Sequence, residues 1–197
     1  MTIIDFLKLT FMPPKNPEQI ARAITEKIAN YSFNLFKNDD FRRMNNFDKI
    51  DTIEQDRIFN EILVSGIAIT IFIFETLGNR TNNNRVNQFY AEMKIELESS
   101  YPNWLRELGS KESDAALWKD LIKMRVDEYE NDYQENRKEI QKRTKAAFAY
   151  VFVVAIGGGK HIARSKKKIM DNIFKQFLRW NTSLTDEILK ILEKTTH

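Results

Sequence analysis

Basic side chains gather in one stretch toward the C-terminal end of the chain. Seven of them are candidate contacts for an anion or a nucleic acid: Lys160, Arg164, Lys166, Lys167, Lys168, Lys175 and Arg179. On a helix, four of these share one narrow stripe: Arg164, Lys168, Lys175 and Arg179. Such a stripe neutralises phosphates without reading bases, so it predicts salt-dependent contact with little sequence preference. The alternative interpretation is a solvated helix face, with Phe174 and Phe177 in the core.

A triple glycine precedes this basic stretch and resembles part of a phosphate-binding loop. The segment Gly157-Gly158-Gly159-Lys160 follows an apolar run. A true phosphate loop also needs an outer glycine and a Ser or Thr after the lysine, to wrap the phosphates and hold magnesium. Here Ala155 and Ile156 replace the outer glycine spacing, and His161 replaces the Ser or Thr after the lysine. We therefore predict a flexible turn between two helices rather than a nucleotide site.

Acidic side chains form a second stripe, which lies earlier in the chain. Glu128, Asp132, Glu135 and Glu139 fall on one helix face. Clustered carboxylates can bind a hard cation, and a di-iron bundle would add Glu-x-x-His pairs. The chain has only two histidines, His161 and His197, and neither follows such a glutamate. We predict no metal and no cofactor. Another interpretation is that the acidic stripe faces the basic stripe, within the chain or across a homodimer.

Motifs for catalysis are missing from the sequence. There is no cysteine, which excludes disulfides, thiolate metal sites and cysteine nucleophiles. Neither a G-x-S-x-G turn nor an H-E-x-x-H helix is present. An enzyme is therefore the least supported class. The prediction is a non-catalytic protein-interaction or regulatory module with a protein partner or a second copy. The alternative is a nucleic-acid-associated protein that uses the basic stretch.

Charge is unevenly distributed along the chain. Residues 140–197 contain 12 Lys and Arg against 4 Asp and Glu, whereas residues 1–139 contain 19 against 24. The net charges, +8 and −5, sum to the overall +3. An acidic body with a basic C-terminal part indicates an acidic partner, such as nucleic acid or anionic lipid.

Two apolar runs, at 62–74 and 146–156, must be buried because they are apolar on every side. Each is shorter than the about 20 residues that a membrane-spanning helix needs, so we expect no integral membrane association. The N-terminus lacks the basic, apolar and cleavage regions of a signal peptide. The expected location is the cytoplasm.

Helical signals position these residues. Asn16-Pro17 and Asp51 with Glu54 predict helix starts, and Gly78 predicts a helix end. We expect Pro102 to end the following helix, Gly109 to close a short connecting helix, and a break near Thr144. Ser183 with Asp186 predicts the start of a last helix. The predicted fold is all-α, a compact single-domain bundle of six or more helices over residues 1–197, built around two buried apolar helices.

Overall fold

The computed structural model describes residues 16–80, 82–143, 148–163 and 167–195, and the regular elements in these ranges are all helical. In chain order they are α2 (Pro17–Lys37), α3 (Asp39–Met44), the 3-10 helix η1 (Phe47–Lys49), α4 (Thr52–Asn79), α5 (Asn84–Glu107), α6 (Glu112–Arg143), α7 (Ala149–Ala163) and α8 (Lys167–Thr195). The prediction of an all-α bundle of six or more helices is confirmed.

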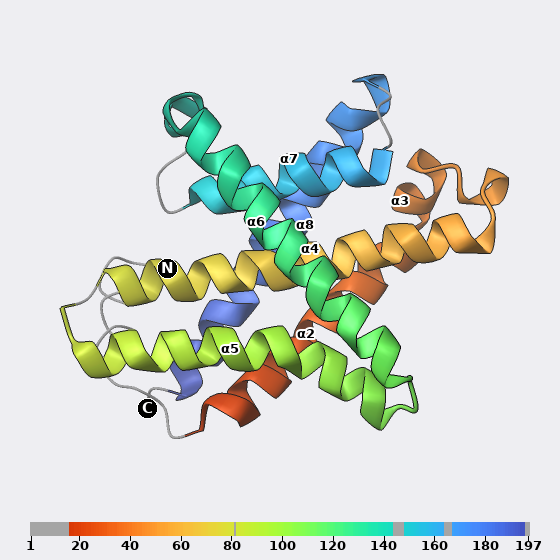
Figure 1. Cartoon of the computed structure of the whole chain (residues 1–197). Coiled ribbons are helices and arrows are strands. Elements are labelled where there is room, and N and C mark those ends of the chain that lie inside the picture. Colours follow the sequence, from red (N-terminus) through yellow and green to blue (C-terminus); the bar gives the residue numbers. More distant parts are fainter. Residues whose placement is uncertain (1–15, 81, 144–147, 164–166, 196–197) are drawn as a thin grey trace.

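α4 is the central helix of the bundle. It packs against α2, α5, α6, α7 and α8, and Figure 1 shows α5 lying alongside it while α6 crosses it obliquely. Within the predicted run 62–74, every residue except Ile73 is buried. At Gly66 a Cβ would lie 2.7 Å from Cγ2 of Ile28, so the glycine lets α2 approach α4 closely. Burial of the first run is thus confirmed.

The helix that carries this run is longer than the run itself. By length and composition α4 is long and apolar enough to cross a membrane. The expectation that the run is too short to span a membrane therefore applies to residues 62–74 and not to the whole helix. Inside the bundle, 78% of its most apolar window is buried, as in the core helix of a soluble protein.

α7 corrects the interpretation of the triple glycine. Gly157, Gly158 and Gly159 are buried inside this helix and form no turn. A Cβ at Gly157 would clash with the ring of Tyr129, and one at Gly158 would clash with the ring of Phe177. The glycines therefore serve close packing against α6 and α8. The predicted break near Thr144 agrees with the end of α6 at Arg143 and the start of α7 at Ala149, although residues 144–147 lie outside the described ranges.

Helix ends follow some of the local signals and override others. Asn16 caps α2 and Asp51 caps α4, each accepting a backbone N–H three residues ahead, and Gly109 adopts the positive φ of 94° that favours glycine. The expectation at Pro102 is wrong, because α5 continues through this buried proline to Glu107.

The capping pair predicted at Ser183 and Asp186 is also wrong, since α8 runs through both residues. Its buried apolar positions continue at helical spacing from Ile173 through Phe177 and Leu184 to Leu192. Packing of this continuous face outweighs the local signal.

Candidate functional site

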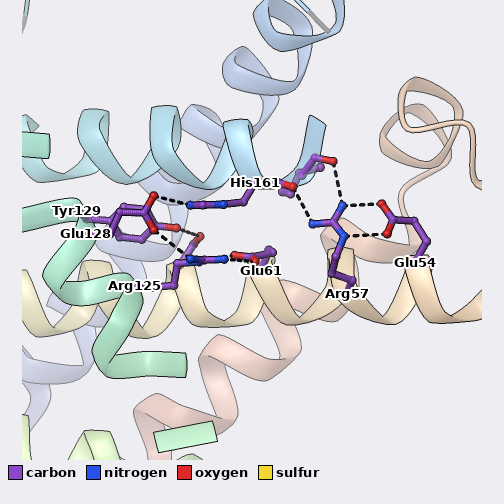
Figure 2. Close-up of polar contacts among 9 residues, drawn as sticks. Glu54, Arg57, Glu61, Arg125, Glu128, Tyr129 and His161 are labelled. Carbon is purple, nitrogen blue, oxygen red and sulfur yellow. Dashed lines mark hydrogen bonds and ion pairs between the residues drawn. The ribbon is translucent and has the colours of Figure 1, made fainter. Parts of the chain in front are cut away.

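A network of polar side chains joins α4, α6 and α7 inside the bundle. It consists of Glu61, Ser65, Arg125, Glu128, Tyr129 and His161 and is called here the Arg125 network. Arg125 donates to both carboxylate oxygens of Glu61, at 2.6 and 2.9 Å, and to Glu128 at 3.0 Å. Figure 2 shows its guanidinium between the two carboxylates. Its hydrogen bonds to Glu61 raise the pKa of Arg125 above its ordinary value, so the group is a permanent cation.

The second half of the network reaches α7. Nε2 of His161 lies 2.8 Å from Oε1 of Glu128. The hydroxyl groups of Tyr129 and Ser65 lie 3.2 Å apart, and Tyr129 is fully buried against Gly157. Burial raises the pKa of Tyr129, so its hydroxyl stays neutral at physiological pH. Each contact ties a different helix to α6.

Arg57 fixes the end of α7 from the side of α4. Its guanidinium donates to the backbone carbonyl of His161 at 2.7 Å and to that of Ile162 at 3.3 Å. It also pairs with Glu54 at 2.6 and 2.8 Å, as Figure 2 shows. The last carbonyls of a helix lack partners within the helix, and a cation there also favours the helix dipole. Arg57 therefore caps α7 on its C-terminal side.

The contacts of the Arg125 network fit a structural role, which holds three helices together, better than a role in acid–base or metal chemistry. A histidine beside a carboxylate is a component of acid–base sites. In the described part of the chain, however, the His161 ring bonds to Glu128, and the Glu128 carboxylate bonds to His161 and Arg125. No hydroxyl group among these residues is bonded to the histidine as a nucleophile would be. No group of three or more histidine and carboxylate side chains among these residues is placed to hold a metal ion.

Glu128 also belongs to an outer surface. An open hollow of about 550 Å³ runs along the exposed face of α6 and is called here the α6 hollow. It is lined by five carboxylates, one lysine, one methionine and one asparagine: Asp120, Asp127, Glu128, Asp132, Glu135, Lys123, Met124 and Asn131. Two large apolar side chains stand exposed on this face, Leu117 at 66% and Met124 at 50%. They are seven residues apart, which places them two turns apart on one side of the helix.

The predicted basic residues are not brought together at one described site. Nζ of Lys160 lies 3.6 Å from Oδ2 of Asp132, at the edge of the α6 hollow. Lys175 and Arg179 are exposed on α8. Arg164 and Lys166, and the side chains of Lys167 and Lys168, lie outside the described part. The acidic stripe thus meets one member of the basic set, Lys160, within the chain.

The Arg125 network is the feature that the sequence interpretation missed. Glu61 directly precedes the apolar run 62–74, yet it is 6% exposed and lies on the buried face of α4. A charge at the edge of an all-round apolar helix signals a need for an opposite charge. The sequence does not show which of the many Lys and Arg side chains pairs with Glu61. No family model, curated protein or solved structure matches this chain.

Proposed function

We propose that this protein is a non-catalytic interaction module whose α6 hollow binds a Lys- and Arg-rich amphipathic segment of a partner protein. One observation carries the proposal: exposed apolar side chains lie in a surface dominated by carboxylates. A partner with apolar residues beside cations complements both features. The cytoplasm is its proposed place of action.

The charge of the hollow supports a cationic partner. Five carboxylates face one lysine along its lining. Asp127 pairs with Lys123 at 2.7 Å, whereas Asp120 and Glu135 have no ion pair among the described residues. Glu128 and Asp132 pair with Arg125 and Lys160, which lie outside the lining. The negative charge that Asp120 and Glu135 leave without a partner raises the local concentration of a basic segment and speeds its association at low ionic strength.

The exposed apolar side chains support a partner that is more than charged. Leu117 and Met124 are exposed on one side of α6, beside the carboxylates of the hollow, and methionine adapts to partners of different shape. The Arg125 network, which shares Glu128 with the hollow, holds α6 against α4 and α7. The binding face is therefore presented on a rigid support, which lowers the entropy lost on binding.

A peptide titration tests this function. The probe is a fluorescent amphipathic peptide of about 18 Leu and Lys residues, long enough as a helix to cover the hollow. We expect saturable binding at low ionic strength. The variant Asp120→Asn, Asp127→Asn, Glu135→Gln should weaken it about tenfold, from three exposed charge contacts.

Two controls make the titration specific. A Ser–Lys peptide of equal charge should bind more weakly, because it lacks apolar groups for Leu117 and Met124. The variant Asp186→Asn removes an exposed carboxylate on α8 and should leave binding unchanged. Equal binding by the parent and the triple variant would remove the α6 hollow from the proposal.

Nucleic-acid binding remains the second candidate function, and it rests on the exposure of Lys175 and Arg179 on α8. These cations are four residues apart and have no ion pair among the described residues. They would contribute phosphate contacts without base recognition.

A further inference from the structure

A second hollow, of about 280 Å³, lies between α6 and α7 and is called here the α6–α7 groove. Its floor is apolar, with Ile140 and Val153 buried and Phe152 and Ile156 half-buried. Its rim is polar, and Asp132 is shared with the α6 hollow. The two hollows therefore adjoin at Asp132.

We infer that the α6–α7 groove receives an apolar anchor side chain of the same basic partner segment, and that Lys160 occupies the position of a partner cation. This inference rests on the proposed function and adds a specific anchor to it. The distance supports a single segment: Asp120 to Glu139 spans about 28 Å of helix, the length of an amphipathic helix of about 19 residues.

Charge complementarity selects the occupant of the groove. Glu139 and Asp132 stand on the α6 side of the rim, and the half-buried Phe152 and Ile156 lie on the α7 side. An apolar side chain with Lys or Arg one turn away meets both features, since carboxylates at the rim of an apolar hollow favour cations beside the anchor. In the free protein Asp132 pairs with Lys160 and Glu139 pairs with the exposed Lys142. A wholly apolar segment would offer these carboxylates no further cation, and an anion would be repelled.

Lys160 already makes the contact that a partner cation would make. Its Nζ lies 3.6 Å from Asp132, and the two side chains are 53% and 29% exposed. A long, solvated ion pair of this kind is weak and readily exchanged. Lys160 is thus an internal competitor, and its removal should strengthen peptide binding, whereas a nucleic-acid contact through Lys160 would be weakened by the same change.

The test measures binding of the Leu–Lys peptide to the parent protein and four variants at low ionic strength. We expect Lys160→Gln to bind about two- to fivefold more tightly than the parent, and Glu139→Gln to bind more weakly by a similar factor. Ile156→Ser should also weaken binding, because the groove loses apolar contact. Lys175→Gln, which removes an exposed lysine from α8, is the matched control and should not change the affinity. Circular dichroism and the urea midpoint check that each variant is folded.

The outcomes separate this inference from the proposed function. Peptide binding that depends on Asp120, Asp127 and Glu135 but not on Lys160, Glu139 or Ile156 overturns the groove and leaves the function standing. No peptide binding overturns both. A dimer in light scattering that Ile156→Ser dissociates assigns the groove to a second copy and also overturns the inference.

Discussion

The guanidinium of Arg125 and the carboxylate of Glu61 form two hydrogen bonds, at 2.6 and 2.9 Å, between α6 and α4. Only 12% and 7% of the two side chains are exposed. A buried pair of this kind contributes little net stability but fixes how the helices meet, because either charge alone would be strongly unfavourable. The pair therefore sets the position of α6, whose exposed face carries the α6 hollow.

This relationship predicts unequal costs for single and double replacement. Arg125→Met should lower the free energy of unfolding by about 3–5 kcal/mol, since Glu61 is left buried without its cation. Adding Glu61→Leu to the same protein should restore most of that loss. Urea denaturation measures both values. The exposed pair of Arg106 with Glu112 is the control, and Arg106→Met should cost less than about 1 kcal/mol. A double variant as unstable as the single one would contradict this account.

The glycines of α7 predict opposite effects at two nearby positions. Gly157→Ala places a methyl group against the ring of Tyr129 and should destabilise the protein by about 1–3 kcal/mol through overpacking. At Gly159 the nearest atoms to a Cβ are 4.0 Å away, so Gly159→Ala should stabilise the helix by up to about 1 kcal/mol. Thermal and urea unfolding compare the two variants. Equal effects of the two substitutions would mean that close packing against Tyr129 does not explain why residue 157 is a glycine.

The helices of this fold follow from local signals where burial and capping agree. The run 62–74 is apolar on every side, so its position at the core could be predicted without knowing its neighbours. Asn16 and Asp51 each cap a helix by accepting a hydrogen bond from the backbone N–H of the residue three positions later. These short-range patterns hold here because the burial of the neighbouring residues agrees with them.

Predictions failed where distant contacts decide. Local rules favour a turn at Gly157, but the ring of Tyr129 on α6 needs the space that a side chain would fill. Pro102 stays within α5 while Tyr101 packs its ring 4.8 Å from that of Trp118 on α6. The pairing of Glu61 with Arg125 spans 64 residues, and sequence spacing alone does not select one arginine among many cations.

Buried tyrosines predict a loss of stability in alkaline solution. Burial raises the pKa of Tyr101 to about 12 and also raises that of Tyr90 above its ordinary value. The unfolded chain releases these protons near pH 10, before the folded chain does, so stability falls as pH rises from about 10 toward 12. Urea midpoints across this range measure the fall. Tyr101→Phe keeps the ring but removes the titrating hydroxyl, and it should reduce the slope by up to about one proton. An unchanged slope would show that Tyr101 titrates in the folded chain as it does in the unfolded one.

The last prediction separates the two candidate functions on one set of variants. We expect Lys175→Ala with Arg179→Ala to bind the Leu–Lys peptide as the parent does, because both side chains are exposed on α8 and neither lines the α6 hollow or the α6–α7 groove. We also expect no saturable binding of mixed DNA and RNA oligomers at low ionic strength. Saturable oligomer binding that this double variant weakens, with the salt slope falling by about one for each phosphate contact removed, would assign the function to the basic stretch instead. Replacement of Lys166, Lys167 and Lys168 together should then weaken binding across all sequences, and Lys160→Gln should weaken it too. The sign of the Lys160→Gln effect therefore discriminates directly, because the same substitution strengthens binding of a cationic peptide and weakens binding of a polyanion.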